Sequence, residues 1–148
     1  DDVMSFDRTE MVSSDKTWKP LYGERSVVKD KYNGAMISFS RKDASQYKMD
    51  IEVRAYNEGI AFRYYFPMHP EAIYHKVTAE NTEFAFPEGT TAWWSQLAQA
   101  PYYSKPLKDC DDMSERPLTL KISDSLFACI IVSHQINFPK SLFRFYVQ

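Results

Sequence analysis

Two adjacent tryptophans, Trp93 and Trp94, are the residues best suited to recognise a ligand by stacking. Neighbouring residues of a strand point to opposite faces of a sheet, so one indole can enter the core while the other faces outward. An outward ring could meet a loop, a neighbouring domain or the apolar face of a sugar. Tyr102 and Tyr103 follow closely and could line the same surface. Packing of both tryptophans and an outward role for one both remain open.

Metal and nucleophile motifs are lacking in the sequence. The histidines His69, His75 and His134 form neither an HxH nor an HExxH string, so we expect them to be structural. There is no GxSxG string, and the four glycines form no phosphate-binding loop. The sequence therefore predicts neither a zinc site nor a serine nucleophile.

Two cysteines, Cys110 and Cys129, are too few for a disulfide framework and form no CxxC pair. We interpret them as separate thiols, with Cys129 buried in a strand, since a disulfide would need an oxidising compartment. Asp109, Asp111 and Asp112 lie beside Cys110, without the glycine and terminal glutamate of an EF-hand loop. We expect a solvated loop there, with a cation site as the alternative.

Length and charge narrow the class of protein. The 148 residues are a one-domain length, and the net charge is -2 without a basic stripe, so nucleic acid is not a predicted partner. The longest apolar stretch, residues 126–132, is far shorter than the ~20 residues that a membrane helix needs. The chain opens on Asp1 without the apolar run of a signal peptide, as a mature secreted protein also would.

Period-2 alternation is the dominant pattern and predicts strands. Its clearest case is a β-hairpin of residues 48–56 and 60–66, joined by a turn at residues 57–59. Glu52 lies on the polar side of this alternation, so we expect a solvated surface acid. Arg63 alternates with aromatic residues, so we expect it to be ion-paired or to extend towards water, in a structural role.

Asn33–Gly34 predicts a second hairpin, between residues 25–32 and 35–41. We expect residues 96–115 to form a long loop, the first 20 residues to be irregular, and residues 126–132 to form a central strand. Further strands are expected at residues 72–79, 82–86, 91–94, 118–122 and 142–147, with a turn at 123–125. Many short strands of this kind predict an all-β, mainly antiparallel fold, a β-sandwich or a barrel, and we expect the sandwich.

Several short strings of the sequence match, in order, the motifs of a known protein family. They lie in order between about Trp18 and Lys140, and the Gly–Ile–Ala–Phe–Arg–Tyr string and the paired tryptophans are the most specific. The strings are Thr–Trp–Lys–Pro at residues 17–20, Tyr–Gly–Glu–Arg at 22–25, Tyr–Asn at 32–33, the core motif at 51–64, Thr–Glu–Phe at 82–84, Ala–Trp–Trp at 92–94 and Pro–Leu–Thr–Leu at 117–120. Together they resemble the N-terminal domain of glycoside hydrolase family 97.

This resemblance implies a supersandwich similar to galactose mutarotase-like folds, spanning residues 1–148 as one incomplete domain. The family implies bacterial α-glucosidases or α-galactosidases, periplasmic or secreted. Their N-terminal domain packs on a (β/α)8 catalytic barrel that is absent from this chain. The family also implies a Ca²⁺ near the active site, with one glutamate ligand from the N-terminal domain. The corresponding position here is Val132, which has no oxygen ligand, so no cofactor is expected in this chain.

Three functions follow as hypotheses. The first is a non-catalytic domain that supports the barrel and walls its cleft, because no spacing selects the two carboxyl groups that glycoside hydrolysis usually needs. The alternative is a stand-alone carbohydrate-binding module without hydrolase activity, with oligosaccharide as its partner. The third is a structural remnant without a ligand. Whether the protein is an enzyme stays uncertain, although this chain alone is not expected to catalyse.

Overall fold

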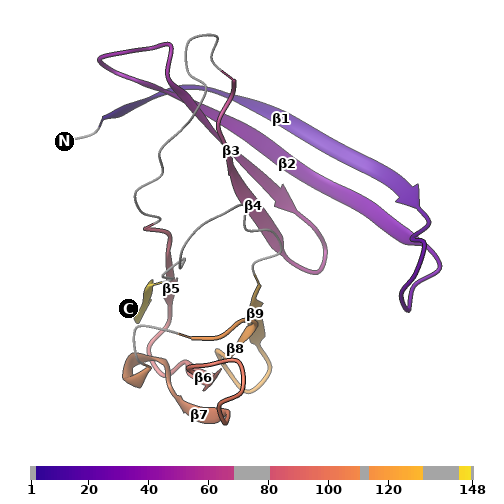
Figure 1. Cartoon of the computed structure of the whole chain (residues 1–148), viewed down its shortest axis with the longest axis vertical. Helices are drawn as coiled ribbons and strands as arrows, with labels where there is room; N and C mark the ends of the chain where they lie inside the picture. The colour runs from indigo at the N-terminus through magenta and orange to yellow at the C-terminus, as the bar shows by residue number, and fades with distance from the viewer. Residues whose placement is uncertain (1–2, 69–80, 111–113, 132–143, 148) are drawn as a thin grey trace. The chain divides into compact units, whose positions relative to one another are not determined.

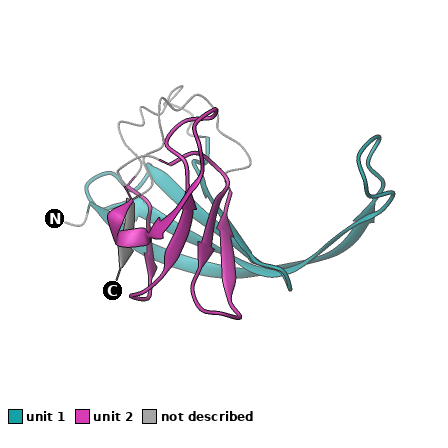
Figure 2. Ribbon diagram, turned by 90° about the horizontal axis from the view of Figure 1, so that it is seen from below, with its two compact units in different colours: residues 1–76 teal, residues 77–148 magenta. Residues whose placement is uncertain are grey.

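The computed structural model describes residues 3–68, 81–110, 114–131 and 144–147. The chain divides into two compact units, residues 1–76 and 77–148 (Figure 2). Each unit contains one antiparallel four-stranded sheet, and this confirms the predicted all-β, mainly antiparallel sandwich class. The described part of the chain contains no helix with the length and apolar character needed to cross a membrane.

The sheet of unit 1 is a meander of four strands. These are β1 (Met4–Trp18), β2 (Val28–Arg41), β3 (Lys48–Ala55) and β4 (Ile60–Tyr65), paired in chain order (Figure 1). The predicted hairpin is confirmed as β3 and β4, whose register pairs Glu52 with Arg63. The backbone N–H of Tyr56 donates to the carbonyl of Gly59 at 2.8 Å and closes the turn.

Two predictions about the first 41 residues are wrong. The segment expected to be irregular is β1, a 15-residue strand, and Asn33–Gly34 lies inside β2 rather than in a turn. Gly34 is needed for space, because a Cβ atom there would lie 2.4 Å from the carbonyl oxygen of Val53 on β3. The glycine thus marks a close approach of two backbones in a sheet, the other common reason for glycine in a strand.

Unit 2 holds the second sheet. Its strands β6 (Thr91–Trp94), β7 (Tyr103–Pro106), β8 (Leu118–Lys121) and β9 (Phe127–Ile130) pair in the order β7-β6-β8-β9. Two further strands, β5 (Glu83–Phe86) and β10 (Arg144–Val147), form a parallel pair. One side of the sheet carries the buried hydrophobic cluster of this unit. That cluster comprises Ala92, Trp94, Leu107, Leu118 and Leu120.

The expected loop at residues 96–115 is only partly irregular. It contains β7 and the 3₁₀ turn η1 (Leu107–Asp109), which places Leu107 in the core. The expected turn at residues 123–125 is confirmed, since the N–H groups of Ile122 and Ser123 donate to the carbonyl of Leu126. The expected strand at 72–79 lies outside the described residues.

The prediction of a central, buried strand at residues 126–132 is wrong for the part that is described. In the described sheet β9 is the last strand, hydrogen-bonded to β8. Phe127 and Cys129 are exposed as well, and the expected burial of Cys129 is wrong. The two cysteines are not joined by a disulfide, which agrees with the expectation of separate thiols. An apolar run on both faces favours a central strand only when both faces are covered.

Candidate functional site

The two tryptophans of β6 point to opposite sides of the unit 2 sheet. Trp94 is 6% exposed and belongs to the core, whereas Trp93 is 37% exposed. The Nζ atom of Lys105 lies 3.7 Å from the centre of the Trp94 ring, a cation–π contact that adds to its packing. The two rings point to opposite sides because successive side chains of the strand at residues 91–94 alternate between its faces. Of the two tryptophans of β6, only Trp93 therefore lies at the surface.

Trp93 is one half of an aromatic surface that the sequence reasoning missed. Its ring centroid lies 6.1 Å from that of Phe127 on β9, at an interplanar angle of 31°. More than half of the Phe127 side chain is exposed. Register connects the two, because Phe127 pairs with Lys121 and Lys121 with Thr91, two residues before Trp93. We call these two rings the Trp93–Phe127 pair.

Hydroxyl groups flank the Trp93–Phe127 pair. Trp93 lies opposite Ser104 on β7 and Thr119 on β8, so both share its face of the sheet. Tyr103, which the sequence placed beside Trp93, instead lies opposite Trp94 and therefore on the other face. Tyr102 precedes β7 and is exposed. A flat ring pair bordered by hydroxyls has the chemistry for stacking on a sugar ring or on a protein surface.

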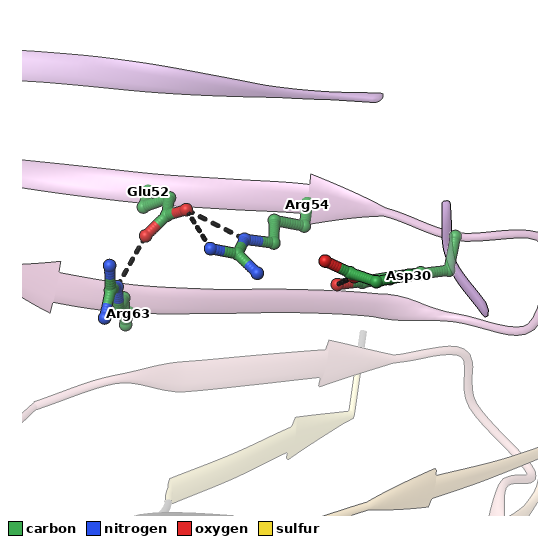
Figure 3. Close-up of polar contacts among 5 residues, drawn as sticks. Asp30, Glu52, Arg54 and Arg63 are labelled. Carbon is green, nitrogen blue, oxygen red and sulfur yellow. Dashed lines mark hydrogen bonds and ion pairs between the residues drawn. The ribbon is translucent and has the colours of Figure 1, made fainter. Parts of the chain in front are cut away.

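A polar network crosses the unit 1 sheet and contradicts one prediction. Glu52, expected to be a solvated acid, is only 6% exposed. Its Oε1 accepts hydrogen bonds from Nε and Nη2 of Arg54 at 2.8 and 2.6 Å, and its Oε2 accepts one from Nε of Arg63 (Figure 3). The long arginine side chains cover the carboxylate, so its place on the polar face does not expose it. The structural, ion-paired role expected for Arg63 agrees with this geometry.

The network continues from Arg54 to the neighbouring strand. The Arg54 guanidinium lies over the ring of Tyr32, 4.5 Å from its centroid, and the Tyr32 and Tyr56 rings are 5.4 Å apart. The hydroxyl of Tyr56 donates to Asp30 at 3.0 Å. A hydrogen bond with Tyr56, and then one with Glu52, raises the pKa of Arg54, so its charge is permanent.

The electrostatics of Glu52 decide what this network can do. Burial is the largest single influence and acts to raise the pKa of Glu52, but hydrogen bonds and charge from Arg54 and Arg63 together outweigh it. The pKa is therefore lowered, and the carboxylate stays ionised with both oxygens engaged. A general acid needs a raised pKa and access to substrate. Glu52 has neither, so we assign it to holding β3 and β4 together.

The structure offers no support for a metal centre in the part of the chain it describes. The described residues contain no group of three or more His, Cys, Asp or Glu side chains that could hold an ion. Of the acidic cluster, Asp109 is exposed in η1, and Asp111 and Asp112 lie outside the described residues. Val132 also lies outside them, and its hydrocarbon side chain does not fit a Ca²⁺ site.

The fold is that of an all-β domain built on two antiparallel four-stranded sheets. A family model described as "Glycosyl-hydrolase 97 N-terminal" matches residues 1–145. The chain therefore belongs to the N-terminal domain family of glycoside hydrolase family 97, as the sequence resemblance indicated.

Solved structures agree with this assignment. The chain is similar to a glycoside hydrolase family 97 enzyme from Pseudoalteromonas sp. strain K8 in complex with acarbose, at 25% identity and a TM-score of 0.75. A variant from the same strain in complex with panose matches in fold at 21% identity and a TM-score of 0.70. In both cases the match covers 84% of this chain and 20% of the other, so the chain spans about a fifth of those enzymes.

Proposed function

We propose that this chain is the non-catalytic N-terminal domain of an α-glycosidase, where it supports a (β/α)8 catalytic barrel and walls one side of its cleft. The observation that carries the proposal is the family match over residues 1–145. The similar enzymes are about five times longer than the part of them that matches this chain. The acarbose and panose complexes of those enzymes favour an α-glucoside as the substrate class. The periplasm or the cell exterior is the proposed location.

Hydrolysis of an aryl α-glucoside tests this proposal. The 148-residue chain is compared with the product of the complete reading frame that encloses it. We expect turnover by the longer product and none by the chain alone. Turnover by the chain alone would overturn the proposal, because a pair of carboxyl groups would then have to act within these residues. A reading frame without a further domain would overturn it as well.

A second function is favoured by one observation, the exposed Trp93–Phe127 pair. Rings of this kind bind the apolar faces of sugars, so the chain could recognise oligosaccharides by itself. Calorimetric titration of the chain with maltooligosaccharides tests this, using Trp93→Ala and, as a matched control, Trp18→Ala on another exposed tryptophan. Saturable binding that Trp93→Ala abolishes and Trp18→Ala preserves supports recognition. Absence of binding leaves the supporting role as the function.

A further inference from the structure

The first two strands extend past the rest of the unit 1 sheet. β3 pairs only with residues 33–40 of β2, whereas β1 pairs with β2 as far as Trp18 and Val28. Residues 14–18 and 28–32 therefore form a two-stranded extension, joined by residues 19–27, and Figure 2 shows this ribbon running out beyond β3 and β4. We call residues 14–32 the arm. A projecting ribbon of this kind buries little of its own surface.

The stem of the arm is polar and stiffened by local contacts. The carboxylate of Asp15 on β1 forms ion pairs across the ribbon with the Nζ atoms of Lys31, at 2.9 Å, and Lys29, at 3.7 Å. At its base, the hydrogen bond from Tyr56 to Asp30 and the contact between the Tyr56 and Tyr32 rings fasten β2 to the neighbouring hairpin. Exposed ion pairs add little stability, so the base contacts hold the arm in place.

The tip of the arm is apolar and uncovered. Leu21 is 99% exposed and Tyr22 is 90% exposed, and Trp18 and Val27 beside them are about half exposed. Gly23 adopts a φ of +112°, which fixes the turn between Tyr22 and the charged residues that follow. A cluster of large apolar side chains beside charges has the composition of a protein interface centre and rim. Side chains as exposed as Leu21 and Tyr22 bury almost no surface, so they contribute little to the stability of unit 1.

We infer that the arm is a docking element whose tip inserts Leu21 and Tyr22 into an apolar pocket of the catalytic domain encoded with this chain. This inference rests on the proposed function. We choose the catalytic domain as the partner of the arm because the match covers only 20% of the similar enzymes, so most of each enzyme lies outside the matched part. A few anchors seated in pockets carry most of the binding energy of interfaces, and tyrosine is enriched among them. The mixed charges of the stem, Asp15 against Lys29 and Lys31, favour a protein over an anionic lipid surface.

Hydrogen exchange on the complete gene product tests the placement of the arm. Backbone amides of residues 19–27 are compared between the complete product and the 148-residue chain. We expect these amides to exchange at least about tenfold more slowly in the complete product, because burial against a partner removes their access to water. Equal exchange rates in the two proteins would overturn the inference. Protection in the chain alone that depends on its concentration would also overturn it, since a second copy would then be the occupant.

Substitutions at the tip of the arm test the docking inference separately from the proposed function on which it rests. The chain and the remainder of its gene product are made as two polypeptides, and their dissociation constant is measured. We expect Leu21→Ser with Tyr22→Ser to weaken association by about tenfold or more. Leu97→Ser, another exposed leucine in a loop, is the matched control and is expected to change it by less than about twofold.

The possible outcomes are distinct. Association that the double variant does not weaken overturns the arm as docking element and leaves the supporting function standing. Absence of any association between the two unmodified polypeptides contradicts the proposed function itself. Thermal unfolding of the variant chain serves as the folding control, and because both side chains are exposed we expect an unchanged midpoint. Binding of the unmodified chain, but not the double variant, to neutral lipid vesicles would overturn the protein occupant in favour of a membrane.

Discussion

Arg63 on β4 donates from its Nε to Oε2 of Glu52 on β3, at 2.5 Å and directly across the hairpin. Arg54 binds the other oxygen of the same carboxylate, so one buried acid is held between two guanidinium groups. The relationship fixes the register of the hairpin at its centre, because a shift by one residue would turn Glu52 to the opposite face. The stability of unit 1 should accordingly depend on this carboxylate.

Replacement of Glu52 by glutamine should destabilise the domain by about 1–3 kcal/mol, because both arginines lose a charged acceptor. The loss stays below that of a fully buried pair, since Arg54 is about one-third exposed and Arg63 more so. Urea unfolding measures the change. Glu10→Gln is the control, because its exposed pair with Arg8 should contribute less than about 1 kcal/mol. Equal effects of the two substitutions would contradict the assignment.

The free energy of unfolding should decrease as the pH is lowered, and part of this decrease should depend on Glu52. The pKa of this group is lowered from its ordinary value of 4.5 in the folded chain. A lowered folded pKa stabilises the native state above the unfolded pKa, and that contribution is lost as pH falls through the folded value. Unfolding free energies measured from pH 6 to about pH 3 should therefore decline less steeply for Glu52→Gln than for the unmodified chain. Parallel curves would argue against the shift.

The two tryptophans should differ in their contribution to stability. Trp94→Ala removes a core side chain and should cost about 3–5 kcal/mol. Trp93→Ala removes a partly exposed ring and its contact with Phe127, and should cost about 1 kcal/mol. Chemical unfolding of both variants measures the difference. A loss for Trp93→Ala as large as that for Trp94→Ala would mean that Trp93 is a packing residue rather than a surface one.

Two glycines provide a matched test of backbone packing. Gly34→Ala should destabilise the domain by about 1–3 kcal/mol, because the new methyl group would collide with the carbonyl of Val53. Gly59→Ala meets no atom within 4 Å and has no positive φ, so it should be neutral or stabilise by up to about 1 kcal/mol. Thermal unfolding of the two variants gives the comparison. A tolerated Gly34→Ala would show that β2 and β3 are less closely paired than the structure has them.

Local patterns were sufficient to predict much of the fold. The hairpin of β3 and β4 and the strands β5, β6 and β8 follow from alternation and turn residues, which act over a few positions. Alternation also separated Trp93 from Trp94, because the period of a strand is independent of what covers each face. The order of the quoted strings was enough to identify the family, which the match over residues 1–145 confirms.

Tertiary pairing decided the remaining features. Asn33–Gly34 can make a turn or approach a neighbouring backbone, and only the pairing of β2 with β3 selects the second. Glu52 is buried because Arg54 and Arg63 converge on it from two strands, and Phe127 reaches Trp93 across β8. Local sequence patterns showed which residues alternate, and they marked the turns at residues 57–59 and 123–125. Which faces are covered, and which distant residues meet, depended on contacts between strands that no local pattern contains.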